Sequence, residues 1–284
     1  MRLIVFLILI TFGILDPTTI SVKAEANHND ENILGIVKET IPTDSVLISP
    51  ENLNSTKPYQ LHDFNNDGHK EIIINYKLIA KKQPNPSKFG AIILKKENDK
   101  WTKIWETKAQ AVGLEYSGAV DITGDGIEEY LFGLTIGASA GNTLKIYKWN
   151  HNSLNMIAEV SFHMMELVSD DKGTGIAVWQ RYIADTYFVD VLKWNGKQLV
   201  FNERLFSKYY PAIEKFYKDK ISKMNPWFYW YTLADAQIKA NFFSKAEISI
   251  NKGITLAKQS SLDDAIENFD QLAVKLEQKK KAAN

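Results

Sequence analysis

The chain has 284 residues, of which 45% are hydrophobic and 24% are charged. This is the composition of a folded globular protein, not of a disordered or collagen-like one. The formal net charge is zero, so no overall basic field predicts binding to nucleic acid. The chain contains no cysteine, which excludes disulfides, thiolate zinc sites, iron–sulfur clusters, cysteine nucleophiles and a lipoprotein anchor.

Residues 1–26 predict a secretory signal peptide. Arg2 precedes a mainly apolar run over residues 3–15, which is shorter than the roughly 20 residues that cross a bilayer. Small residues at positions −3 and −1 favour cleavage after Ala26 or Ala24. We therefore expect an exported chain, secreted or cell-wall associated, with no stable membrane span after cleavage. The alternative is an uncleaved anchor or a buried core helix.

The rest of the sequence divides into three segments. Residues 27–57 predict a short helix over 32–40 and then an irregular, proline-containing lead-in. Residues 58–207 show short strands rich in β-branched and aromatic residues, whereas residues 208–284 show helical periodicity. The charge changes sign at the same boundary. The helical segment has 13 basic and 9 acidic side chains, and residues 27–207 have 19 and 23.

The strand-rich segment contains an internal repeat, which indicates a modular fold. Two acidic stretches, residues 63–71 and 121–129, carry acids at matching positions 58 residues apart, and a hydrophobic strand follows each. A third stretch, residues 170–178, keeps only the first acid. Turn residues that tolerate positive φ recur at Asn98-Asp99, Asn150-His151 and Asn195-Gly196. These turns predict β-hairpins, and each unit of roughly 45–60 residues is the size of one propeller blade.

The first two acidic stretches predict calcium-binding loops. Their pattern places oxygen ligands at alternate positions, and a glycine permits the sharp turn that points these oxygens at one centre. The expected ligands are Asp63, Asn65, Asp67, the His69 carbonyl and Glu71 in the first loop, and Asp121, Thr123, Asp125, the Ile127 carbonyl and Glu129 in the second. Hard oxygen ligands at flexible spacing suit Ca²⁺ better than Mg²⁺. The alternative is an acidic β-turn that binds no metal.

The loops DFNNDGHKEI and DITGDGIEEY resemble the FG-GAP (VCBS-type) repeats of the integrin-alpha amino-terminal propeller and of bacterial surface proteins. The resemblance covers residues 58–207 and implies four-stranded blades in which calcium braces a hairpin loop. Thr123 departs from the family's usual Asp or Asn. The chain has material for about three to four blades. We expect a mainly β plus α fold, with a small or incomplete β-propeller-like domain followed by a helical bundle over residues 208–284.

The helical segment resembles one tetratricopeptide repeat (TPR). The stretch FYWYTLADAQIKANFFSKAEISINKGI places large and small residues at the packing positions of that family, namely Trp230, Leu233, Ala234, Ala246, Ile250 and Gly253. One repeat with flanking helices is too short for a long groove, because such repeats need stacked neighbours. The segment is therefore expected to cap the sheet domain, and a peptide- or protein-binding surface is the alternative.

The sequence offers one weak catalytic motif. Ser139 is the centre of G-x-S-x-G, but the residues after it alternate like a strand, whereas a nucleophile elbow needs a helix there. The five histidines have no zinc-binding spacing. We predict a non-catalytic, adhesion-type interaction module at the bacterial cell envelope that binds a protein or polysaccharide ligand. The alternatives are an extracellular hydrolase of cell-wall or other polymer, and a structural domain whose ligand surface has decayed.

Overall fold

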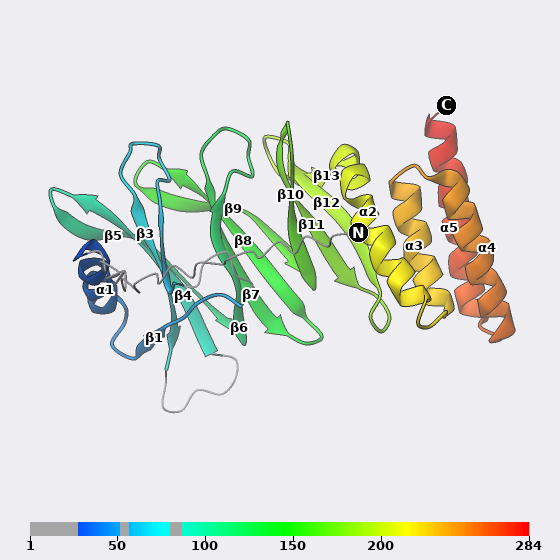
Figure 1. The fold of residues 1–284 in the computed structure, drawn as a ribbon, viewed down its shortest axis with the longest axis horizontal. Helices are drawn as coiled ribbons and strands as arrows, with labels where there is room; N and C mark the ends of the chain where they lie inside the picture. Colours follow the sequence, from blue (N-terminus) through cyan, green and yellow to red (C-terminus); the bar gives the residue numbers. More distant parts are fainter. Residues whose placement is uncertain (1–27, 52–56, 80–86, 284) are drawn as a thin grey trace, which may run out of the picture.

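The computed structural model describes residues 28–51, 57–79 and 87–283, so the expected signal peptide lies outside the described residues. Within these ranges, 13 strands form three antiparallel sheets that are accompanied by five helices (Figure 1). None of the three sheets closes into a barrel. The predicted combination of β and α structure is confirmed, whereas a propeller is not confirmed.

The first sheet surrounds the first acidic stretch. Its strands are β1 (Ser45–Leu47), β2 (Tyr59–His62), β3 (Glu71–Leu78), β4 (Ser87–Glu97) and β5 (Lys100–Ala111). They pair in the order β1-β3-β4-β5, and β2 also pairs with β3. Helix α1 (His28–Thr40) precedes the sheet and begins four residues earlier than expected. Within the described residues 41–51 the lead-in is also less irregular than expected, because Val46 of β1 pairs with Lys77 of β3.

The second and third sheets are four-stranded meanders. The second contains β6 (Gly113–Val120), β7 (Glu129–Gly137), β8 (Gly141–Asn150) and β9 (Ser153–Phe162), and the third contains β10 (Met164–Asp170), β11 (Gly173–Arg181), β12 (Tyr187–Trp194) and β13 (Leu199–Phe201). In both, consecutive strands are neighbours. The three predicted hairpin turns are confirmed, since positive φ occurs at Asn98 (47°), Asp99 (63°), His151 (57°) and Gly196 (96°).

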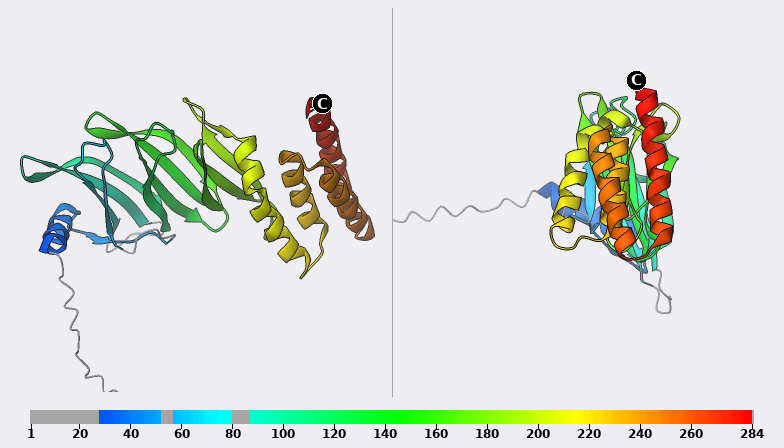
Figure 2. Two further views of the ribbon diagram at one scale, coloured as in Figure 1. Left: turned by 45° about the horizontal axis from the view of Figure 1, so that its top comes forward. Right: turned by 90° about the vertical axis from the view of Figure 1, so that its right-hand side faces the viewer.

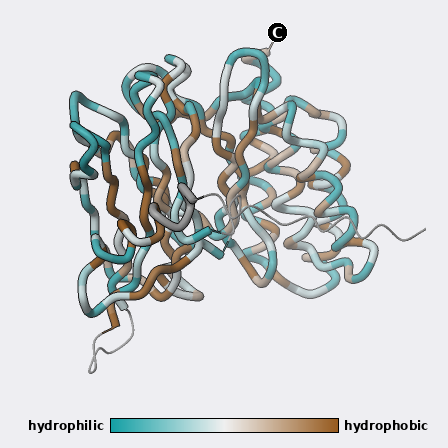
Figure 3. The backbone as a smooth tube through the Cα atoms, turned by 60° about the vertical axis from the view of Figure 1, so that its left-hand side comes forward, coloured by the Kyte–Doolittle hydropathy of each residue, from teal (hydrophilic) through white to brown (hydrophobic). Residues whose placement is uncertain are grey.

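The three sheets stack face to face in a row, because each is apolar on both faces. In β3, Ile72 and Ile74 face helix α1, whereas Ile73 faces the second sheet, as the alternation of a strand requires. In β7, Phe132 faces the first sheet and Leu131 the third. Figure 3 shows hydrophobic segments along the strands inside the stack and hydrophilic segments at many of the turns. Burial on both faces explains why these strands are almost continuously hydrophobic.

Helices close both ends of the row. Helices α2 (Glu203–Ile221) and α3 (Trp227–Lys239) follow the third sheet, and α4 (Phe243–Gln259) and α5 (Asp263–Ala283) pack beyond them (Figures 1 and 2). The outer face of the third sheet packs on α2 and α3 through a shared core, and α1 covers the opposite end. Because helices cover both end faces, the row of described sheets does not return on itself as a ring.

The helical region begins at Glu203, five residues before the expected boundary at 208. The cause is Asn202, whose side-chain Oδ1 accepts a hydrogen bond from the Leu205 amide at 2.9 Å and so caps α2. None of the described helices is long and apolar enough to cross a membrane.

Gly253 permits the close packing of α4 on α5. A Cβ atom at this position would lie 1.9 Å from Cζ of the fully buried Phe269. We expect Gly253→Ala to destabilise the protein by about 1–3 kcal/mol, because the core cannot absorb the added methyl group without repacking. Urea unfolding checks this. The control is Gly35→Ala on α1, where a Cβ meets nothing within 4 Å and a gain of about 0.5–1 kcal/mol is expected. Equal effects of the two substitutions would contradict the packing role.

Candidate metal-binding loops

The two acidic loops occupy equivalent places in neighbouring sheets. Loop 1 (residues 63–70) joins β2 to β3, and loop 2 (residues 121–128) joins β6 to β7. They also contact each other. Asn66 Nδ2 donates to the Gly126 carbonyl at 3.0 Å, and His62 Nδ1 lies 3.2 Å from Glu128 Oε2. Two segments 58 residues apart in the sequence therefore form one continuous surface at this edge of the row.

The carboxylates of Asp63 and Asp67 accept hydrogen bonds from backbone amides of loop 1 itself. Asp63 accepts from the amides of Asp67 (3.1 Å) and Gly68 (2.9 Å), and Asp67 accepts from the His69 amide at 2.8 Å. Asn65 Nδ2 donates to Asp67 Oδ2 at 2.8 Å. The hydrogen bonds from His69 and Asn65 lower the pKa of Asp67. Gly68 has φ +83°, a conformation that glycine adopts without strain.

Glu71, the last predicted ligand of loop 1, is buried at the start of β3 and is 1% exposed. Its Oε2 accepts from the Phe64 amide at 3.0 Å. Its Oε1 is buried as well, and within the described part of the chain it has no hydrogen-bond partner. Burial raises the pKa of Glu71. A buried polar atom without a partner costs free energy, so this oxygen is the least satisfied part of the loop.

Loop 2 repeats this arrangement, but here both oxygens of the corresponding glutamate accept hydrogen bonds. Asp121 accepts from the amides of Gly124 (2.6 Å) and Gly126 (2.9 Å), and Asp125 accepts from Ile127 at 3.1 Å. Glu129 is fully buried.

Both carboxylate oxygens of Glu129 have partners. Its Oε2 accepts from the amides of Ile122 (2.9 Å) and Thr123 (3.0 Å), and its Oε1 accepts from Thr123 Oγ1 at 2.9 Å. The hydroxyl group of Thr123, which stands at the third position of the loop, completes the hydrogen bonding of Glu129.

A lysine also reaches each loop, and the sequence analysis missed both. Lys95 Nζ lies 3.3 Å from Asp67 Oδ2. Lys148 Nζ donates to Thr123 Oγ1 at 2.9 Å, lies 3.3 Å from Glu129 Oε1 and pairs with Asp125. Lys95 follows Leu94, which pairs with Ile72, and Lys148 follows Tyr147, which pairs with Tyr130. Ile72 and Tyr130 each follow the last glutamate of their loop, so the two lysines hold the same register position. The signal that could have revealed them is the lysine that precedes each asparagine-containing hairpin turn.

The third acidic stretch is not a loop of the same kind. Asp170 ends β10, a two-residue turn follows, and Thr174 to Val178 belong to β11. Arg204 of α2 pairs with Asp170 and lies 3.2 Å from Asp171, and Lys193 donates to the Lys172 carbonyl. A basic side chain thus contacts the corresponding acidic turn in all three sheets.

The expected ligand sets remain a prediction. Among the residues that the structure describes, no three His, Cys, Asp or Glu side chains form a group that could hold a metal ion. The carboxylates of both loops instead accept backbone hydrogen bonds, as in an acidic turn. The donor chemistry still fits a hard cation, since each loop offers three carboxylates. In loop 1 the unpaired Glu71 Oε1 is an additional acceptor.

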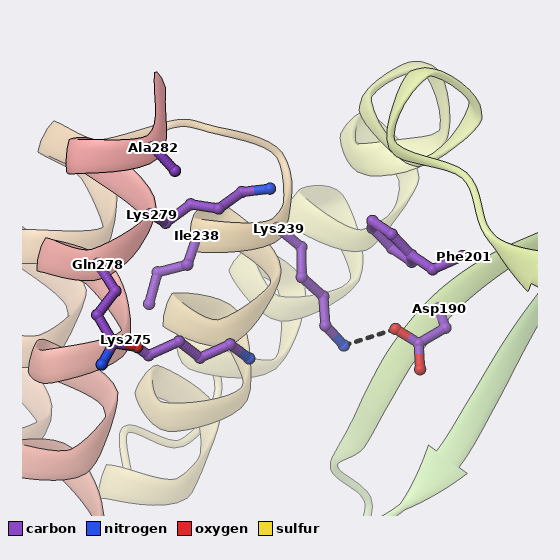
Figure 4. A pocket seen from close by; sticks show the side chains of 8 residues that line it. All are labelled: Asp190, Phe201, Ile238, Lys239, Lys275, Gln278, Lys279 and Ala282. Carbon is purple, nitrogen blue, oxygen red and sulfur yellow. Dashed lines mark ion pairs between the residues drawn. The ribbon is translucent and has the colours of Figure 1, made fainter. Parts of the chain in front are cut away.

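A separate pocket of about 370 Å³ lies between the third sheet and the helices (Figure 4). Its lining residues are Asp190, Phe201, Ile238, Lys239, Lys275, Gln278, Lys279 and Ala282.

The three lysines of this pocket are matched by acids. Lys239 Nζ lies 2.7 Å from Asp190 and 3.0 Å from Asp235, and Lys275 Nζ lies 2.6 Å from Asp235. Lys279 Nζ lies 3.2 Å from Glu203. The charges cancel, so the pocket presents no excess positive charge to an anionic ligand.

Ser139 lies in the turn of the β7–β8 hairpin, between two antiparallel strands. A nucleophile elbow connects a strand to a helix, so this serine lacks the surroundings that the motif requires. Comparison with known protein families and with curated proteins finds no match for this chain.

The buried Asp235 predicts a pH dependence of stability. Burial raises its pKa, but Lys239 and Lys275 lower it more, so the pKa lies below the ordinary value of 3.8. The stabilisation is therefore complete above about pH 4 and is lost as the pH falls through the lower folded-state pKa.

We expect Asp235→Asn to cost about 3 kcal/mol at pH 7, because two lysines lose their buried partner. It should also flatten the loss of stability below pH 4, as measured by urea unfolding at several pH values. Asp270→Asn, at an exposed position of α5, is the control and should keep the wild-type slope. An unchanged slope in Asp235→Asn would contradict the assignment.

Proposed function

We propose that the protein is an exported, non-catalytic, calcium-binding interaction module at the bacterial cell envelope. The observation that carries the proposal is the pair of acidic loops side by side at one edge of two stacked sheets, joined by the Asn66–Gly126 hydrogen bond. Calcium bound there would hold the neighbouring loops in one conformation, and the loop edge would present a fixed surface to a protein or polysaccharide ligand.

The proposal extends to the architecture. The three sheets are taken as FG-GAP-like blades arranged in an open row, and the helices after Asn202 as a TPR-like cap. The shared core of the third sheet with α2 and α3 supports the role of a cap. The buried faces of Trp227 and Tyr231, which pack against Phe269, support a packing role for the aromatic residues of α3.

The proposed export predicts the start of the mature chain. Residues 1–26 or 1–24 should be removed, because the apolar run is too short to remain as a span. Amino-terminal sequencing of the exported protein should begin at Glu25 or Asn27. A sequence that begins at Met1 in exported material would contradict the prediction.

Calcium should raise the thermal stability. A ligand that binds only the folded state at a hundredfold excess over its Kd stabilises it by about 2.7 kcal/mol, and extracellular modules often bind calcium with a Kd of about 10⁻⁴–10⁻³ M. With 10 mM calcium the midpoint of thermal unfolding should rise by about 2–4 °C for each kcal/mol that calcium adds to the free energy of unfolding. Magnesium at equal concentration should raise it less. Identical melting curves in calcium and in chelator would refute the calcium proposal.

A further inference from the structure

The two acidic loops are not equivalent. We propose that loop 2 carries its own cation, the ammonium group of Lys148, and that only loop 1 takes up a divalent cation. The part of this inference that concerns loop 1 rests on the proposed function, because it assumes calcium binding. The part that concerns loop 2 depends only on side chains of this chain.

In loop 2, one ammonium group engages three of the five residues expected to hold calcium. Lys148 Nζ contacts Asp125, Thr123 Oγ1 at 2.9 Å and Glu129 Oε1 at 3.3 Å. A lysine has three N–H donors, so these contacts use its full capacity. The fully buried Glu129 is thereby both charge-compensated and hydrogen-bonded at each oxygen. An incoming divalent cation would have to displace Lys148 before reaching the same oxygens.

In loop 1, the equivalent lysine leaves the equivalent glutamate unsatisfied. Lys95 reaches Asp67 Oδ2 at 3.3 Å, and its Nζ lies 5.5 Å from the centre of the Trp149 ring of the second sheet. A cation at this distance from an aromatic face is attracted to it, which favours a position at the margin of the loop. Lys95 is thus shared between loop 1 and the neighbouring sheet, unlike the lysine of loop 2.

The third position of the loop accounts for the rest of the difference. In loop 2 the Thr123 hydroxyl donates to Glu129 Oε1. In loop 1 the corresponding Asn65 donates to Asp67 Oδ2 instead. Glu71 Oε1 is therefore buried without a partner among the described residues. A buried carboxylate oxygen that lacks a donor is the group that a divalent cation would satisfy.

The third sheet extends the same pattern. Its acidic turn has lost the loop, and Arg204 of α2 pairs with Asp170 and Asp171. Lys193 of β12 donates a hydrogen bond to the Lys172 carbonyl of the same turn. Asp170 Oδ2 of this turn is, like Glu71 Oε1, buried without a hydrogen bond among the described residues, but it forms an ion pair with Arg204. Within the same part of the chain no basic side chain pairs with Glu71 Oε1, so this oxygen of loop 1 has neither kind of partner.

Calcium titration by calorimetry of the purified protein tests the inference. The wild type should bind one ion per chain. Lys148→Met should bind two, because loop 2 then loses its internal cation. The matched control, Lys95→Met, should still bind one ion, with higher affinity since a competing charge is removed from loop 1. In the wild-type background, Asp67→Asn should abolish binding and Asp125→Asn should leave one ion bound.

The outcomes separate the inference from the proposed function. Two ions bound by the wild type, or loss of the ion in Asp125→Asn and not in Asp67→Asn, would overturn the inference and leave calcium binding intact. One ion in both the wild type and Lys148→Met would overturn it too, because Lys148 would not be the excluding group. No calcium bound by the wild type at 10 mM would overturn the proposed function itself.

Thermal unfolding in the presence of a chelator tests the role of Lys148 in loop 2 without calcium. Lys148→Met should lower the thermal midpoint more than Lys95→Met, because it leaves the buried Glu129 without a charge partner, whereas Lys95 pairs with the less buried Asp67. Equal shifts in the two variants would contradict the role of Lys148 as the internal cation of loop 2.

Discussion

Burial of each sheet on both faces is the constraint on which the rest of the structure depends. A sheet with one polar face can expose that face to solvent, but the strands here place large apolar side chains on both faces. Ile72 and Ile73 are each fully buried and belong to different cores on opposite faces of the first sheet. Each sheet therefore needs a cover on each side, and three sheets in a row leave two end faces. Helix α1 covers one of them, and α2 with α3 covers the other. The helical region is in this sense part of the β fold, because the third sheet would expose its apolar face without it.

Stacking of similar meanders also determines where the acidic loops meet. Loop 1 joins β2 to β3 in the first sheet and loop 2 joins β6 to β7 in the second, and the stacking of these two sheets makes the loops neighbours. The contact between Asn66 and Gly126 and the position of Lys95 near Trp149 both follow from this arrangement. Phe64 of loop 1 stacks on Trp149 of the second sheet with an interplanar angle of 4°. Loop 1 is therefore in direct contact with both loop 2 and the second sheet.

The sequence was sufficient for the features that depend on local chemistry. The repeated acidic stretches, the hairpins at Asn98-Asp99 and Asn195-Gly196 and the change from strand to helix follow from turn propensity and periodicity, and the structure confirms these elements. It was not sufficient for features that depend on register across strands. Lys148 lies 19 residues after Glu129 in the chain, and only the pairing of β7 with β8 brings it to the loop. The start of α2 was missed because a single cap, Asn202, determined it.

The glutamate at the ninth position shows why an acidic loop pattern alone cannot identify a metal site. In both loops this residue accepts a hydrogen bond from the amide at the second position, Glu71 from Phe64 and Glu129 from Ile122. That bond closes the loop without an ion, so the acid has a role in the backbone conformation of the loop that does not depend on metal binding. A buried carboxylate that stays ionised nevertheless needs a compensating charge, and a metal ion, a lysine or an arginine can each supply it. In loop 2 Lys148 of the neighbouring strand reaches the glutamate itself, and in the third sheet Arg204 pairs with Asp170, whereas Lys95 reaches Asp67 of loop 1 and forms no ion pair with Glu71. Two loops with nearly the same acids can in this way differ in whether they need an external ion.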